Sequence, residues 1–85
     1  MAEVLVQYQE VVVGPDGTRY SARACGAALD NVLWEGWVEF VPIAGGPTLR
    51  SPRETTQPNL VDTRYWATGL TPVYLEGALM RALAS

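Results

Sequence analysis

The chain has 85 residues, the size of one small domain spanning 1–85, and its formal net charge at pH 7 is −3. It contains no histidine, no lysine and one cysteine, Cys25. These absences exclude histidine-activated serine or cysteine nucleophiles, histidine-ligated zinc, lysine Schiff bases and an internal disulfide.

The composition also limits the partners and the location that we expect. The acidic balance disfavours nucleic acid as the main partner, because phosphate contacts need a cationic surface. No apolar run approaches the roughly 20 residues that span a bilayer, and the first residues carry an acid where a secretory signal is basic. We therefore expect a cytoplasmic protein with no nucleic-acid or membrane partner, no metal and no cofactor.

The first two expected strands are joined by a tight turn. Residues 4–13 are rich in β-branched side chains, and the period of two places Val4, Val6, Tyr8 and Val12 on one face. Residues 14–18 read Gly-Pro-Asp-Gly-Thr, which predicts a type I turn with Gly17 in the left-handed conformation. The second strand, residues 19–28, has an inner face of alanine and glycine. We expect tryptophans to fill the space above it.

A third strand follows the turn at Asp30-Asn31. Residues 34–42 place Trp34, Gly36, Val38 and Phe40 on one face and Glu35, Trp37, Glu39 and Val41 on the other. After a glycine-rich turn, residues 48–53 predict a short fourth strand. Pro52 favours an edge position, since proline cannot donate to a ladder.

Two helices complete the chain. Asn59 is a good N-cap for a helix that Gly69 ends, and Thr71-Pro72 starts a second helix that runs to about Ala84. The sequence thus predicts an α+β fold, in which an antiparallel meander of three or four strands precedes two C-terminal helices packed on the sheet.

The last helix is unusually apolar, since Glu76 and Arg81 are its only charged residues. One interpretation is a helix sandwiched between the sheet and the first helix. The other is a self-association surface, because a helix that packs on one side only should have a polar back. For that surface we select four residues, Val73, Leu79, Met80 and Leu83.

Trp37 is a second candidate for an interface, because tryptophan is enriched in contact patches. The alternative for this side chain is ordinary packing across a pair of strands.

Residues 50–59 suggest a binding site for a small anion. Arg50 and Arg53 precede a helix that begins near Asn59, and both arginine forks and helix N-termini favour carboxylate or phosphate. The alternative is internal ion pairing of these arginines with Glu54, Asp62 or the acidic sheet.

Other groups offer little chemistry. Cys25 is expected to be a buried structural residue, since no histidine activates it. Glu35 and Glu39 share a strand face, an arrangement that two-carboxylate hydrolysis could use but that is also common on solvated strands. A hydrolase is therefore the third hypothesis.

Three segments carry a resemblance: residues 34–42 (WEGWVEFVP), 53–59 (RETTQPN) and 65–79 (YWATGLTPVYLEGAL). The chain resembles, over about residues 17–83, a group of short uncharacterised bacterial proteins. The resemblance implies a bacterial origin and a complete protein, and it supplies no catalytic residues. The leading hypothesis is a non-enzymatic interaction module that forms a homo-oligomer, with a dimer favoured; the alternative is the anion binder.

Overall fold

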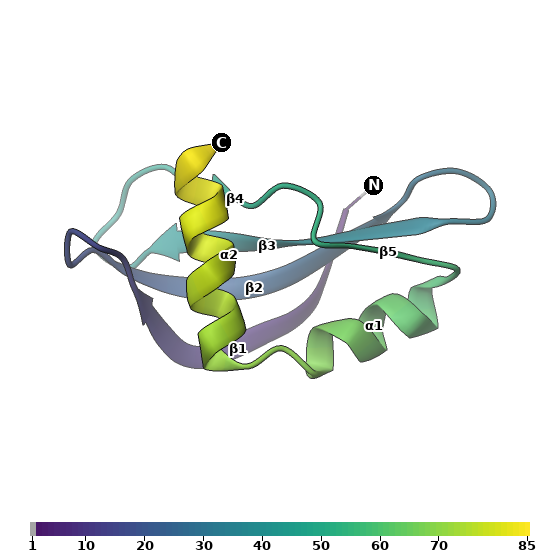
Figure 1. Cartoon of the computed structure of the whole chain (residues 1–85), viewed down its shortest axis with the longest axis horizontal. Helices are drawn as coiled ribbons and strands as arrows, with labels where there is room; N and C mark the ends of the chain where they lie inside the picture. Colours follow the sequence, from purple (N-terminus) through teal and green to yellow (C-terminus); the bar gives the residue numbers. More distant parts are fainter. Residues whose placement is uncertain (1) are drawn as a thin grey trace.

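The computed structural model describes residues 2–85, and it confirms the α+β meander (Figure 1). Four antiparallel strands lie side by side in chain order: β1 (Glu3–Val13), β2 (Arg19–Ala28), β3 (Trp34–Pro42) and β4 (Leu49–Arg50). A fifth strand, β5 (Thr55–Gln57), also pairs with β3. The helices α1 (Leu60–Thr68) and α2 (Pro72–Ala84) follow.

The turn between β1 and β2 has the expected geometry. The Gly17 amide donates to the Gly14 carbonyl at 3.0 Å, and the Gly14 amide donates to the Thr18 carbonyl at 2.8 Å. Gly17 has a φ of +85°, in the left-handed region that a side chain disfavours. Local turn chemistry therefore sets the start of the β1–β2 register.

The first strand departs from the simple period of two. The β1–β2 pairing shifts register between Val4 and Val6 and again between Gln7 and Val11. These irregularities leave Val4 exposed, while Tyr8 and Val12 pack with the core. The expected common face of Val4 and Val12 is therefore wrong, because the extra residue between Val4 and Val6 reverses the side to which the residues after it point.

The edge beside β3 consists of two short strands, β4 and β5, separated by an irregular segment. Within this segment the Ser51 amide donates to the Val38 carbonyl at 2.9 Å, and the Ser51 hydroxyl accepts from the Val38 amide at 3.0 Å. The Glu54 amide then donates to the Gly36 carbonyl at 2.8 Å. β5 could not be predicted from the sequence, because its three polar residues give no hydrophobic pattern.

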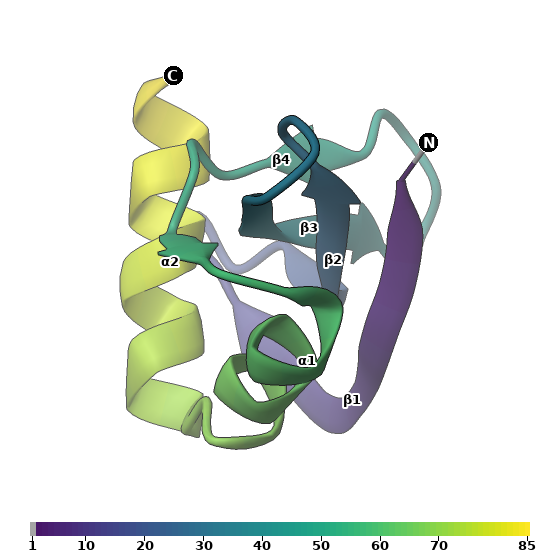
Figure 2. The same ribbon diagram turned by 90° about the vertical axis from the view of Figure 1, so that its right-hand side faces the viewer.

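Both helices cover the same face of the sheet, here called the inner face; the opposite one is the outer face. In Figure 1 α2 crosses in front of the strands, and Figure 2 shows it standing along one side of the sheet. The helix caps are as expected: Asn59 Oδ1 accepts from the Asp62 amide at 2.8 Å, and Thr71 Oγ1 accepts from the Tyr74 amide at 3.2 Å.

Leucines from α2, rather than three tryptophans, fill the space over the small inner face of β2. Leu75 and Leu79 belong to the same core cluster as Ala22, Val38 and Phe40. Trp66 of α1 lies against Gly36, where a built Cβ would sit 2.6 Å from the indole ring. Trp37 lies on the outer face, as the alternation of β3 predicts. Tryptophans were expected to fill the space over β2. Trp66 does pack against the core, although it lies on Gly36 of β3, whereas Trp37 is on the other face of the sheet and the expectation is wrong for it.

Candidate functional site

The structure divides the predicted interaction residues into two groups. Trp37 is 2% exposed and Leu79 is 1% exposed, so the prediction that they lie on a contact surface is wrong. Val73 is 77% exposed, and Met80 and Leu83 are each about half exposed. The last three remain available to a partner.

The exposed residues of α2 lie opposite its packed side. Leu75, Ala78, Leu79 and Ala82 are its buried residues. At 3.6 residues per turn, Val73 and Met80 lie on the other side of the helix, and Leu83 lies on its flank next to Leu79. Since all three are exposed, α2 is covered on one side only, and the sandwiched interpretation does not describe it.

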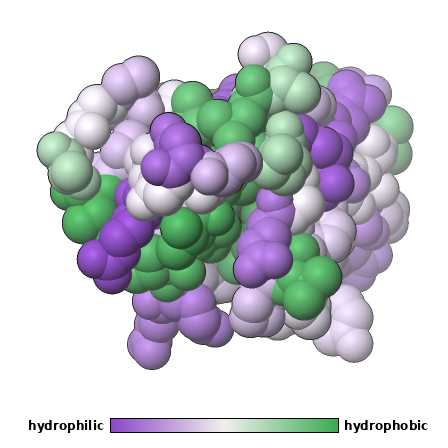
Figure 3. Space-filling view, turned by 60° about the vertical axis from the view of Figure 1, so that its left-hand side comes forward, coloured by the Kyte–Doolittle hydropathy of each residue, from purple (hydrophilic) through white to green (hydrophobic). Residues whose placement is uncertain are grey.

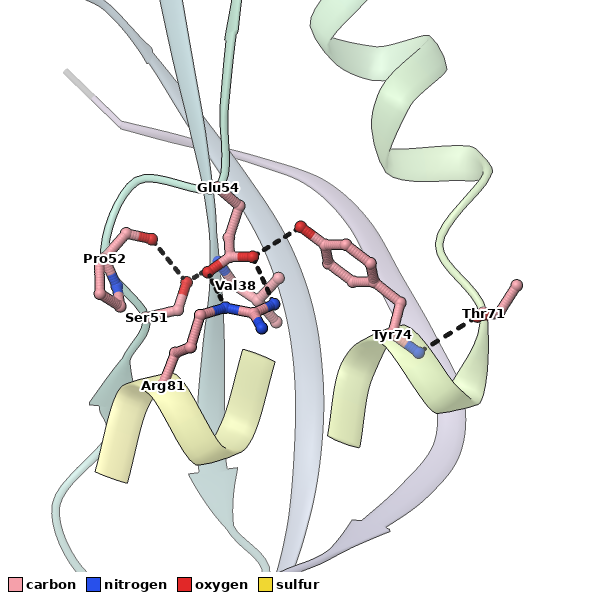
Figure 4. A network of polar contacts seen from close by, with 7 residues as sticks. All are labelled: Val38, Ser51, Pro52, Glu54, Thr71, Tyr74 and Arg81. Atoms are coloured by element: carbon pink, nitrogen blue, oxygen red, sulfur yellow. Dashed lines mark hydrogen bonds and ion pairs between the residues drawn. The ribbon is translucent and has the colours of Figure 1, made fainter. Parts of the chain in front are cut away.

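The single cation of α2 is directed at the edge of the sheet (Figure 4). Arg81 Nη2 and Nε donate to the two carboxylate oxygens of Glu54 at 2.7 and 2.9 Å, and the Tyr74 hydroxyl donates to the same carboxylate at 2.6 Å. The Glu54 side chain is only 4% exposed. Gly77 leaves room for this arrangement, because a Cβ there would lie 3.3 Å from Arg81 Nη1.

The hydrogen bonds within this network shift the pKa values of Glu54, Tyr74 and Arg81, the last of which is raised by its bond to Glu54. Burial acts to raise the pKa of Glu54, but the hydrogen bonds from Arg81 and Tyr74 outweigh it and hold that pKa below its ordinary value. Burial and the bond to Glu54 raise the pKa of Tyr74 to about 12. Glu54 is therefore ionised, and Tyr74 neutral, at pH 7. The partner of Glu54 is 27 residues away in sequence, so no local signal predicts this pair.

The three predicted anion-binding residues each have a different neighbour. Arg53 Nε donates to Glu35 at 3.3 Å, so its ion pair is with the acidic sheet rather than with Glu54 or Asp62. The Asn59 side chain caps α1. The Arg50 guanidinium stacks on the Trp37 indole, 3.8 Å from the ring centroid.

A second network lies on the outer face. Glu39 accepts from Arg23 Nε at 2.9 Å and from Trp37 Nε1 at 3.0 Å. Burial and the nearby Glu39 carboxylate raise the pKa of Cys25 to about 11, so this thiol is protonated at neutral pH. Glu35 and Glu39 are both paired with arginines.

A pocket of about 310 Å³ lies between the β1–β2 turn and the turn after β3, away from every predicted site residue. Its lining residues are Gly17, Thr18, Arg19, Pro42, Ile43, Ala44 and Gly45. Figure 3 brings this end of the molecule forward and shows apolar residues gathered across the middle of the face, separated by single hydrophilic ones.

No family model, curated protein or solved structure matches this chain. Among residues 2–85, no helix is both long and apolar enough to cross a membrane. Within the same residues, no three potential metal ligands of the histidine, cysteine, aspartate and glutamate types gather at one place.

Proposed function

We propose that this protein is a non-enzymatic cytoplasmic interaction module that binds a second copy of itself through the exposed side of α2. One observation carries the proposal: the part of α2 that the sheet does not cover presents Val73, Met80 and, on its flank, Leu83 to solvent. Contiguous apolar patches on the surface of a protein often mark the sites where it binds other proteins.

The distribution of charge on α2 adds support. Arg81 is bonded to Glu54, which leaves Glu76 as the one charged residue on the exposed side of this helix among residues 72–84. Charged residues are depleted in the centre of protein interfaces. Two copies related by a two-fold axis would bring identical apolar patches together, the usual symmetry of homodimers.

The small surface of the molecule limits the expected affinity of the dimer. A stable interface buries about 800 Å² on each partner, and the whole chain exposes 5042 Å². A 13-residue helix is about 20 Å long, so α2 alone supplies only part of that area. Val61 and Tyr65 on α1 are also highly exposed and can extend the contact. We expect a dimer that dissociates in the micromolar range.

Sedimentation velocity over a concentration series tests the proposal. The wild type should approach twice the 9.3 kDa monomer mass as the concentration rises. Met80→Glu and Leu83→Glu should each restore the monomer. Val13→Glu is the matched control, because Val13 is as exposed as Met80 but lies on β1. A wild type that stays monomeric, or a control that dissociates equally, contradicts the assignment to α2.

A further inference from the structure

Trp37 forms a fixed platform on the outer face. Its indole is buried, and its Nε1 donates to Glu39 Oε2 at 3.0 Å. The other carboxylate oxygen, Glu39 Oε1, accepts from Arg23 Nε and Nη2 at 2.9 and 2.8 Å. The ring therefore has little freedom to rotate, and Glu39 has its charge balanced by Arg23.

Arg50 lies over this platform, with its guanidinium carbon 3.8 Å from the ring centroid, and forms no ion pair with a carboxylate of the described residues. The four ion pairs among residues 2–85 involve Arg23, Arg53, Arg64 and Arg81. The Trp37 ring lies on one side of this guanidinium, whose N–H donors form a planar fork. The β3–β4 ladder fixes the backbone of Arg50, which lies opposite the backbone of Glu39. An ordered, exposed arginine fork is the result.

The charges around Arg50 favour an anion. The outer-face cluster holds Arg23, Arg50 and Arg53 against Glu35 and Glu39, which is three positive charges and two negative ones, or +1. Both glutamates already have arginine partners. The charge left uncompensated is that of Arg50.

We infer that Arg50, held on Trp37, binds an oxyanion, either a carboxylate or a phosphate group. The guanidinium fork matches the two oxygens of such a group, and the stack reduces the side-chain entropy that binding would otherwise cost. Arg53 is not part of this site: its partner Glu35 lies four residues along β3 from Glu39, or about 13 Å at the usual strand rise. The helix start at Asn59 is likewise not part of it.

Amide and side-chain NMR shifts under titration test this inference. Inorganic phosphate and succinate are added separately at constant ionic strength, while the Trp37 Nε1–H and Arg50 Nε–H signals are followed. Saturable shifts of both signals are expected at millimolar anion. A tighter response to succinate would identify a carboxylate ligand, and a tighter response to phosphate a phosphate ligand.

Three variants separate Arg50 from general charge effects. Arg50→Gln should weaken binding at least about tenfold, as expected for the loss of a charged hydrogen-bond donor. Arg53→Gln and Arg19→Gln make the same change in charge elsewhere and should bind like the wild type. Unchanged Trp37 and Arg50 signals in the wild type, or equal weakening in all three variants, would overturn the inference. Spectra with native dispersion confirm that each variant is folded.

Discussion

Replacing Glu54 by glutamine should loosen the polar attachment of α2 to the β4–β5 edge. Glu54 accepts from Tyr74 and from two nitrogens of Arg81. The amide of glutamine keeps one accepting oxygen and substitutes an NH₂ group that cannot accept. At least one hydrogen bond and the ion pair are therefore lost.

The expected loss of stability in Glu54→Gln follows from how deeply Glu54 and Arg81 are buried. A hydrogen bond to a charged group contributes about 1.5–3 kcal/mol. Arg81 is 46% exposed and recovers part of this energy from water, although the Glu54 side chain is almost fully buried. We expect Glu54→Gln to lower the free energy of unfolding by about 1–2 kcal/mol at pH 7. For a domain of this size, Tm falls by roughly 4–16 °C.

The effect should depend on pH in a defined direction. The folded-state pKa of Glu54 is lowered relative to the unfolded chain, so its ionised form stabilises the fold. This contribution is fully present above the unfolded pKa of about 4.3 and is lost as the pH falls through the lower folded value. The stability difference between the wild type and Glu54→Gln should therefore be constant from pH 7 to about 5 and shrink below pH 4.

Urea unfolding followed by circular dichroism measures both effects. Glu3→Gln is the control, because the Glu3–Arg64 pair is 3.5 Å long and about half exposed on both sides. It should change stability by less than about 0.5 kcal/mol. A Glu54→Gln variant as stable as the control at pH 7, or a difference that grows in acid, would refute the argument.

Three further predictions concern single residues. Gly17→Ala should destabilise by about 1 kcal/mol through its φ of +85° alone, since no atom lies within 4 Å of a built Cβ; an unchanged urea midpoint would contradict this. Gly36→Ala should cost about 1–3 kcal/mol and alter tryptophan fluorescence, because its Cβ would overlap Trp66; native fluorescence and stability would show that the ring moves freely. Cys25, buried and with a pKa of about 11, should react with a disulfide reagent at pH 8 only after denaturant is added, and rapid reaction of the folded protein would disprove its burial.

Features encoded by neighbouring residues could be predicted from the sequence. The turn at Gly17 and the caps at Asn59 and Thr71 depend on contacts within four residues, and all three were located correctly. The alternation of β3 also predicts correctly that Trp37 and Phe40 point to opposite faces of the sheet. Local propensity and period therefore suffice for the strand order and for both helices.

Features that depend on distant partners could not be predicted. Trp37 is covered by Arg50, which reaches it only because β4 returns to the edge of β3. Glu54 finds Arg81 across 27 residues, and the register shifts of β1 exist only in its pairing with β2. Exposure of an individual side chain is a tertiary property, and this explains why Leu79 was assigned to the wrong side of α2.

The Tyr8 hydroxyl donates to the Ala67 carbonyl at 2.6 Å. This bond joins β1, at the start of the chain, to the end of α1, which is made 59 residues later. On a ribosome, the three long strands emerge before any residue that covers their inner face. At about 5–20 residues per second, the interval between Pro42 and Ala84 lasts roughly 2–8 s. During that interval Val38 and Phe40 of the nascent hairpins lack the cover that α2 gives them in the folded protein.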